Sequence, residues 1–280
     1  MKTVKVCYSI RDNIGDSINP LIIEKVLGVK IEWADPLNCQ TSGIGSGLSR
    51  YFINSKKRYT TYSGLKKAVG GIIHNNPLQI WSAGFISHNH QKESAIRRNT
   101  NVASVRGELS KKRLEKALGK KLDIPTGDGG LLAEMLLTEK SNKKYRLGII
   151  PHIREIGEKK YNEIYDKHPK SIIIDVRTAP NEFLKLISKC ECVISSSLHG
   201  LIISDSFYIP NQQVVLTNKL KGDGFKFEDY YSSFGLTAKA LDLNTVNEIN
   251  IDEIISSYQI SEAMTDRKKE EIATSFFKYI

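Results

Sequence analysis

The stretch CVISSSLHGLIISDSF, residues 192–207, decides the fold of this chain, because a short apolar run passes through serines directly into a helical pattern. Cys192–Ser195 predicts a buried strand, and Leu198–Phe207 predicts a helix that stops before Pro210. The surrounding sequence repeats this alternation, with strands predicted at 147–150, 171–176 and 213–216 and a helix over 181–189. Alternating strands and helices are typical of a parallel sheet covered on both faces, so this half is predicted to be a Rossmann-like domain.

The first half of the chain shows a less regular version of the same pattern. Alternation at Val4, Val6 and Tyr8 predicts an opening strand, followed by a helix with Asn19 as its N-cap. The remaining signals are Pro20 at the first helical position, Gly28 at the end of that helix, a strand at 102–105, and a helix over 109–118 that ends at Gly119. A charged stretch, 138–144, is the expected boundary between a domain of residues 1–140 and one of residues 141–280. A final helix, from about Asp252, can pack back across the first domain.

Composition limits the class of protein. The chain has 280 residues, of which 40% are hydrophobic, enough for a sizeable core without disulfides or a structural metal. Its four cysteines lack paired metal-ligand spacing, so reduced thiols, a cytoplasmic location and no metal site are expected. The first ten residues alternate charged and apolar side chains and lack the unbroken apolar stretch of a signal peptide. No apolar run approaches the ~20 residues that span a bilayer, so a soluble protein is expected.

The net charge of +10 indicates either an acidic partner or charged side chains that are simply exposed to solvent. An anionic small substrate, an anionic membrane surface and nucleic acid would each suit a positive field. Nucleic acid is not expected, because no recognisable binding motif accompanies the charge.

The strongest chemical signal is Ser196-Ser197-Leu198-His199, where the predicted strand meets the predicted helix. A helix N-terminus offers unpaired N–H groups and a partial positive charge, so it binds phosphate or carboxylate. The serine hydroxyls and the imidazole of His199 can reach the same anion. The alternative is that the serines only cap the helix and that His199 is a hydrogen-bonded interface residue.

A second strand-to-helix segment, Asp12 to Pro20, contains Asn13, Gly15 and Asp16. Glycine permits a tight turn there, and the Asp16 carboxylate can hydrogen-bond sugar hydroxyls or accept a hydroxyl proton. The alternative is a second helix cap. Three glycines at 43, 45 and 47 do not match a dinucleotide-binding loop, because the third is too close and no apolar strand precedes them.

Further candidates are cations and a histidine at predicted strand ends and loops. Arg106 follows a strand and can clamp an anion with two N–H groups or form an interdomain salt bridge. His152 and Arg154 end the first strand of the second half. Lys226 lies in the turn-rich segment 222–231, predicted to be a surface loop, and could supply another cation. Asp128 is expected to cap the helix that follows it.

Taken together and in order, six segments resemble the polysaccharide pyruvyl transferase family. They are NIGDSINP at 13–20, SVRG at 104–107, TGDGGLL at 126–132, IIPH at 149–152, SSSLHG at 195–200 and GFKFEDYY at 224–231. The resemblance implies a glycosyltransferase-B-like fold, with two Rossmann-like domains facing a cleft, and phosphoenolpyruvate bound mainly by the second domain. It implies no cofactor beyond this co-substrate. Many family members carry arginine where this chain has Ser197, so the missing charge must come from Arg106, Arg154 or Lys226.

This resemblance gives each candidate a role. The donor-binding set is expected to be Ser196, Ser197, His199, Arg106, Lys226 and Arg154, and the acceptor-binding set Asn13, Gly15 and Asp16. His199, Asp16 and His152 are the expected catalytic residues, with the proton donor open between the two histidines. The partners would be phosphoenolpyruvate and a glycan acceptor, either free or lipid-linked and then reached at the cytoplasmic membrane face. The alternatives are a nucleotide-sugar-dependent transferase or epimerase on the same fold, and a non-catalytic anion- or nucleic-acid-binding protein.

Overall fold

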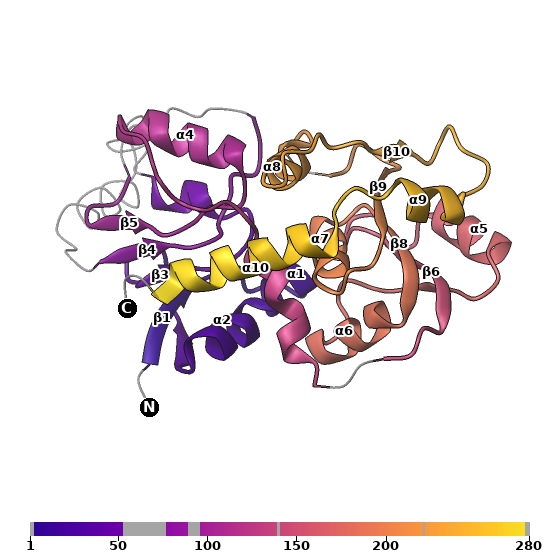
Figure 1. Cartoon of the computed structure of the whole chain (residues 1–280), viewed down its shortest axis with the longest axis horizontal. Coiled ribbons are helices and arrows are strands. Elements are labelled where there is room, and N and C mark those ends of the chain that lie inside the picture. Colours follow the sequence, from indigo (N-terminus) through magenta and orange to yellow (C-terminus); the bar gives the residue numbers. More distant parts are fainter. Residues whose placement is uncertain (1–2, 53–76, 89–95, 139–140, 221, 278–280) are drawn as a thin grey trace.

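The computed structural model describes residues 3–52, 77–88, 96–138, 141–220 and 222–277. These residues form two five-stranded sheets whose strands all run parallel to their neighbours. Figure 1 shows the sheets side by side, one built from each half of the chain. Among the described helices, none is both long and apolar enough to cross a bilayer.

The first sheet has the strand order β2-β1-β3-β4-β5. Its strands are β1 (Thr3–Cys7), β2 (Lys30–Trp33), β3 (Thr41–Ser42), β4 (Leu78–Ile80) and β5 (Thr100–Val102). The helical segments of this half are α1 (Ile14–Ser17), α2 (Asn19–Leu27), η1 (Leu48–Tyr51), α4 (Glu108–Leu118) and η3 (Gly129–Leu136).

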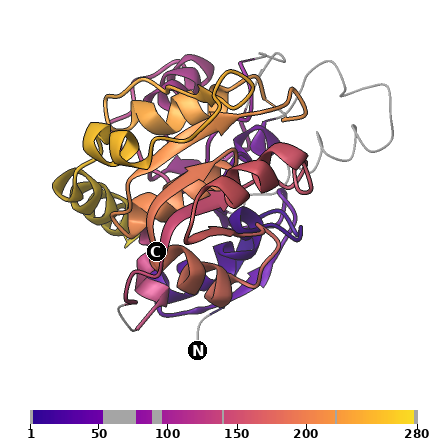
Figure 2. The same cartoon turned by 90° about the vertical axis from the view of Figure 1, so that its right-hand side faces the viewer.

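The second sheet has the order β10-β9-β8-β6-β7. Its strands are β6 (Tyr145–Ile150), β7 (Ser171–Ile173), β8 (Cys190–Ser195), β9 (Asn211–Val215) and β10 (Leu241–Asp242). The helices are α5 (Lys159–Lys167), α6 (Pro180–Ser188), α7 (Leu198–Ser206), α8 (Phe225–Ser232), α9 (Ile251–Ser257) and α10 (Glu262–Phe277). Figure 2, with this domain toward the viewer, shows helices on both faces of its sheet.

Both sheets therefore share one topology, since the first strand of each half lies between its second and third strands. The order reverses between β1 and β3 in one sheet and between β6 and β8 in the other. In parallel sheets this reversal opens a binding position beyond the carboxyl ends of the two strands. The predicted fold class, α/β with two Rossmann-like domains, is confirmed.

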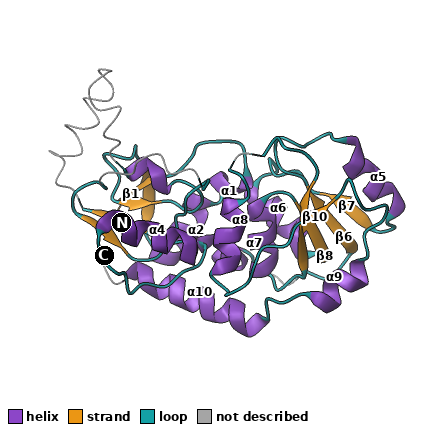
Figure 3. Ribbon diagram, turned by 90° about the horizontal axis from the view of Figure 1, so that it is seen from above, coloured by secondary structure: helices purple, strands orange, loops and turns teal. Residues whose placement is uncertain are grey.

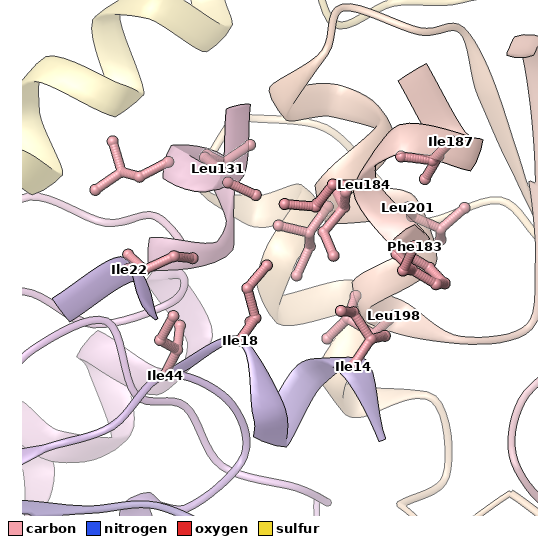
Figure 4. Close-up of a cluster of buried hydrophobic side chains, with 14 of the residues drawn as sticks. Ile14, Ile18, Ile22, Ile44, Leu131, Phe183, Leu184, Ile187, Leu198 and Leu201 are labelled. Carbon is pink, nitrogen blue, oxygen red and sulfur yellow. The ribbon is translucent and has the colours of Figure 1, made fainter. Parts of the chain in front are cut away.

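The two domains share one hydrophobic cluster, drawn in Figure 4. Ile14 of α1 lies beside Leu198 and Phe183 of the second domain, and Ile18 and Ile22, at the start of and within α2, continue the cluster into the first domain. All five side chains are at most 3% exposed. The backbone N–H of Ile14 also donates to the Val176 carbonyl oxygen at 2.7 Å. This packing holds the carboxyl edges of the two sheets against each other, and Figure 3 shows α1, α6, α7 and α8 between the sheets.

The last helix, α10, runs from the second domain back to the first (Figures 1 and 3). The indole N–H of Trp81 donates to the Ile272 carbonyl oxygen at 3.0 Å, and the Gln79 amide donates to that of Phe276 at 3.1 Å. The Trp81 and Phe276 rings meet edge to face with centroids 4.5 Å apart. The C-terminal segment thus completes the core of the N-terminal domain.

Most helix ends agree with the sequence signals, but two predictions are wrong. Gly28 and Gly119 end α2 and α4 in the left-handed conformation, as predicted. Asn19 is not an N-cap: its buried side chain donates backward to the Gly15 carbonyl oxygen at 2.9 Å and accepts from the Ile44 N–H at 2.6 Å. The predicted surface loop at 222–231 contains the helix α8, half of whose residues are buried. Contacts to both domains, described below, stabilise this helix.

Candidate active site

The two sheet edges meet at His199, the second residue of α7. Its imidazole lies against Gly15 of α1: a Cβ atom added to that glycine would be 2.1 Å from His199 Nδ1. Gly45, after β3, and Gly130, in η3, lie beside the same ring, with their Cβ positions 3.6 and 3.7 Å from it. Thus His199 of the second domain occupies a space bounded by three glycines of the first. The absence of side chains at those positions makes that space possible.

The start of α7 presents free backbone donors. The N–H groups of Leu198 and His199 make no hydrogen bond to the described residues, as expected for a first helical turn. Ser197 is the N-cap, 4% exposed, and its hydroxyl does not cap the helix. Instead Ser195 Oγ accepts from the Ser197 N–H at 2.9 Å, and its one proton is shared between the carbonyl oxygens of Ser197 and Ile150, both 2.9 Å away. The turn is therefore held by Ser195, which leaves the Ser197 hydroxyl available to an anion.

His199 is neutral in the unliganded protein. Burial, together with the positive charges of Lys226 and Arg106, lowers its pKa to about 3. Its Nε2 is inaccessible to solvent and has no hydrogen-bond partner within the described residues. The alternative of a fully hydrogen-bonded interface histidine is therefore wrong. A buried polar atom left unpaired costs free energy, which a ligand could recover.

Lys226 projects from α8 into the same region. Burial and the nearby charge of Arg106 lower its pKa to about 8, while the Glu155 carboxylate opposes this shift. Its ammonium lies 5.0 Å from the Phe227 ring centroid, and it forms no hydrogen bond or ion pair with any described residue. Below pH 8 the site therefore contains a partly buried cation that pairs with no carboxylate among the described residues. Such a group is poised to bind an anion.

His152, after β6, faces Lys226 and Arg154. Burial and the charge of Lys226 lower the pKa of His152 to about 4, with a smaller contribution from Arg154. The imidazole Nδ1 accepts from the Arg154 N–H at 3.2 Å, so neutral His152 carries its proton on Nε2. Arg154 itself is exposed, and its guanidinium donates to the Lys219 carbonyl oxygen at 3.0 Å. It lies at the rim rather than inside the site.

A fully buried carboxylate, Glu155, organises the polar side of this region. It accepts hydrogen bonds from the Thr217 N–H at 3.0 Å, the Thr217 hydroxyl at 2.7 Å and the Tyr161 hydroxyl at 2.8 Å. Because Tyr161 donates to Glu155, the Ser196 hydroxyl must donate to Tyr161, 2.9 Å away, while it accepts from the His152 N–H. The only proton of the Ser196 hydroxyl is thereby used. The prediction that Ser196 donates to the ligand disagrees with these contacts.

Arg106 is also engaged elsewhere. Its guanidinium is wholly buried and forms an ion pair with Asp229 of α8, with Nε 2.9 Å from Oδ2. It donates as well to Ser46 Oγ at 2.7 Å and to the Phe85 carbonyl oxygen at 2.5 Å. Asp229 in turn accepts from the Ser110 N–H and hydroxyl at 2.7 and 2.6 Å. Arg106 therefore forms the predicted interdomain salt bridge rather than a free clamp for the donor. Its positive charge still lowers the pKa of His199 and of Lys226.

The edge of the first sheet contributes a carboxylate, Asp16. Burial raises its pKa, and the nearby Arg11 and Arg50 charges and a hydrogen bond from Ser9 oppose that effect. Asn13 caps α1 by accepting from the Gly15 N–H at 3.0 Å. Asp16 directly follows Gly15, the glycine that contacts His199. A carboxylate with a raised pKa at this position is suited to accept a proton from a hydroxyl group.

Sequence reasoning missed four contributors to the site: Glu155, Tyr161, Asp229 and Gly45. Gly45 is one of the three glycines at 43, 45 and 47 that do not match a dinucleotide-binding loop. Its backbone nevertheless lies beside His199, with φ 97°. Asp128 is confirmed as a cap, accepting from the Gly130 N–H at 2.9 Å, and burial raises its pKa to about 6. Within the described part of the chain, no group of three or more His, Cys, Asp or Glu side chains is arranged to hold a metal ion.

Comparisons with known proteins place the chain in a family. A family model described as polysaccharide pyruvyl transferase matches residues 10–211, which include both sheet edges and His199. A curated relative, an uncharacterised protein of Acanthamoeba polyphaga mimivirus, is 26% identical over 240 residues, covering 84% of this chain and 76% of its own length.

Two solved structures also resemble the chain. One, from Listeria monocytogenes and provisionally assigned as a UDP-N-acetylglucosamine 2-epimerase, has a TM-score of 0.48 and 11% identity, covering 97% of this chain and 90% of its own. The other, S. aureus MnaA with UDP, has a TM-score of 0.48 and 10% identity, covering 99% and 92%.

Proposed function

The chain belongs to the polysaccharide pyruvyl transferase family, and from that premise we propose that it transfers pyruvate from phosphoenolpyruvate to two hydroxyl groups of a glycan, forming a ketal. The observation that carries this proposal is the partly buried, unpaired ammonium of Lys226, which lies near the start of α7 and the unpaired Nε2 of His199. Phosphoenolpyruvate is a compact anion with a phosphate and a carboxylate. It matches a site that offers positive charge and backbone N–H donors.

Lys226 also accounts for the absence of an arginine at position 197. Of the three cations, Arg106 is already engaged in an ion pair with Asp229, and Arg154 lies exposed at the rim. Lys226 is the one whose charge acts on both His152 and His199. We assign it the role of the main cation for the donor, with Ser197 and the N–H groups of α7 as further ligands.

The chemistry follows from the donor being an enol ester. Protonation of the methylene carbon creates positive character at the adjacent carbon, and one glycan hydroxyl adds there. The bond from that carbon to the phosphate oxygen then breaks, and the second hydroxyl closes the ketal. Of the two hydroxyl protons, one ends in the new methyl group and the other on the released phosphate, so no oxidant or reductant is required.

Side chains of both domains serve these steps. The Asp16 carboxylate, whose pKa burial raises, would accept a hydroxyl proton from the acceptor. A bound dianion favours the charged form of a neighbouring imidazole, so His152 and His199 both qualify as the acid that protonates the methylene carbon. The cations around the phosphate stabilise it as it leaves.

We place the reaction in the cytoplasm, on a polysaccharide or its lipid-linked precursor. All four cysteines are free and buried, which suits a reducing compartment. A lipid-linked acceptor would bring the enzyme to the cytoplasmic face of the membrane, where a net charge of +10 favours contact with anionic lipids.

The test combines binding with product analysis. The protein is incubated with phosphoenolpyruvate and a panel of short and lipid-linked oligosaccharides, and pyruvate incorporation is followed by mass spectrometry together with phosphate release. Lys226→Met should weaken phosphoenolpyruvate binding about 10- to 100-fold, whereas Lys239→Met removes the same charge from an exposed position and should have no effect. Failure of phosphoenolpyruvate to bind, or tighter binding of UDP at the same site, would contradict the proposal.

A further inference from the structure

An exposed tryptophan, Trp33, lies on the same sheet edge as Asp16, the carboxylate that we assign to the acceptor side of the site. Trp33 is the last residue of β2 and pairs in register with Val6 of β1. Because β1 and β2 are parallel neighbours, their carboxyl ends emerge at one edge, and the chain after β1 continues through Ser9 to Asp16. Trp33 is therefore one strand away from the point where the strand order of the first sheet reverses.

The Trp33 ring is held in place but not covered. Its side chain is 46% exposed, although its indole N–H donates to the Tyr8 carbonyl oxygen at 3.0 Å. This hydrogen bond fixes the ring against the segment that leads to Asp16. The other tryptophan of the chain, Trp81, is fully buried. An exposed large aromatic side chain with its polar atom already paired offers its flat face to a ligand.

The segment after Tyr8, to which the Trp33 indole is hydrogen-bonded, bears both apolar and polar groups. Ile10, two residues beyond Tyr8, is 72% exposed. Arg11 follows it, and the Arg50 guanidinium donates to the Ser9 hydroxyl. A sugar ring has an apolar C–H face and a rim of hydroxyl groups. This combination of an indole face, an aliphatic side chain and guanidinium donors is complementary to both parts.

We infer that Trp33, Ile10, Arg11 and Arg50 form a subsite for a glycan residue next to the one that is modified. This inference rests on the proposed function, which requires a glycan hydroxyl pair near Asp16. A membrane surface fits less well, because the exposed carboxylates of Asp12 and Glu32 lie beside these residues in the sequence and would repel anionic lipids. The subsite would select acceptors longer than one sugar.

Trp33→Ala is the direct test, and Tyr165→Ala is the matched control. Tyr165 of α5 is 45% exposed, almost the same as Trp33, but α5 lies at the end of the second domain that is farthest from the first (Figure 1). We expect Trp33→Ala to raise KM for an extended oligosaccharide about tenfold. Its kcat, its affinity for phosphoenolpyruvate and its KM for a single-sugar acceptor should stay as in the wild type, and Tyr165→Ala should change none of these.

Intrinsic fluorescence gives a second readout that does not need turnover. In the wild type, the extended oligosaccharide should change the emission of the exposed Trp33. The Trp33→Ala variant retains only the buried Trp81, so its emission should not respond to the oligosaccharide. An unchanged KM together with no oligosaccharide-dependent emission change would overturn the subsite. Loss of binding to phosphatidylglycerol vesicles in Trp33→Ala, without any effect on glycans, would overturn it in favour of a membrane contact. Absence of pyruvyl transfer by the wild type would instead refute the proposed function, while the emission titration would still test the subsite.

Discussion

Replacing Gly15 by alanine tests the closest contact between the two domains at the candidate site. The added Cβ would lie 2.1 Å from His199 Nδ1 and 2.5 Å from Cε1, whereas ordinary contacts begin at 3.4 Å. The imidazole must therefore retreat by about 1.3 Å, or α1 must move away from α7 by a similar distance. The Gly15 backbone is not in the left-handed region, so alanine itself fits the local conformation.

We expect Gly15→Ala to reduce kcat/KM strongly and the unfolding free energy only modestly. A misplacement of about 1 Å in a catalytic group reduces the rate about 100-fold, so kcat/KM of Gly15→Ala should fall by that order. Overpacking costs about 1–3 kcal/mol of unfolding free energy, partly offset by the better helix propensity of alanine. The variant should thus remain folded at 25 °C.

The assay measures phosphate release from phosphoenolpyruvate in the presence of an accepted glycan, alongside urea unfolding. Gly47→Ala is the matched control, because its Cβ would come no closer than 3.8 Å to any side chain and its φ is −101°. The control should retain full activity. Wild-type kcat/KM in Gly15→Ala would refute the conclusion that His199 must occupy this space.

Three further predictions concern the charges around α8. Because the pKa of Lys226 is about 8, phosphoenolpyruvate affinity should decline about tenfold per pH unit above pH 8, when titrated by calorimetry between pH 6 and pH 10. In the unliganded protein the sign is opposite: the unfolded state, with the ordinary lysine pKa of 10.5, holds more protons between pH 8 and 10.5, so unfolding free energy should rise across that window. A flat affinity profile would remove Lys226 from the binding role. Asp229→Ala leaves Arg106 charged and buried, and should lower the unfolding free energy by about 3–5 kcal/mol in urea titrations. The double variant Arg106→Met/Asp229→Leu should recover much of that loss, and a cost below about 1 kcal/mol for the single variant would contradict the buried ion pair.

Local patterns were sufficient to predict the elements that bear the site. The run from Cys192 to Phe207 contains its own strand, turn and helix signals, and α7 lies within one residue of the prediction. Glycine after α2 and α4 likewise marks their ends, because few other residues adopt that conformation without strain. The position of His199 in the first turn of α7 follows directly from such local information.

Partners distant in sequence could not be predicted in this way. Arg106 and Asp229 are 123 positions apart, and nothing near either residue shows that they pair. The helix α8 was missed for the same reason, since its stability depends on contacts to both domains. Its Asp229 binds the first domain, and the Tyr230 hydroxyl donates to Asp205 of α7 at 2.5 Å. Without those anchors, GDGFKFEDYY has the composition of a loop.

The two anchors of α8 explain how a site can tolerate serine at position 197. A cation on the helix start itself would reach the donor directly, whereas Lys226 must be brought there by a separate helix. Asp229 fixes α8 to Arg106 and Ser110 of the first domain, and Tyr230 fixes it to the second. Lys226, three and four residues away, lies on the adjacent turn of the same helix, so its position follows from both anchors. The cation should therefore be in place only when the two domains are correctly packed, which makes anion binding a property of the assembled pair of domains rather than of either one.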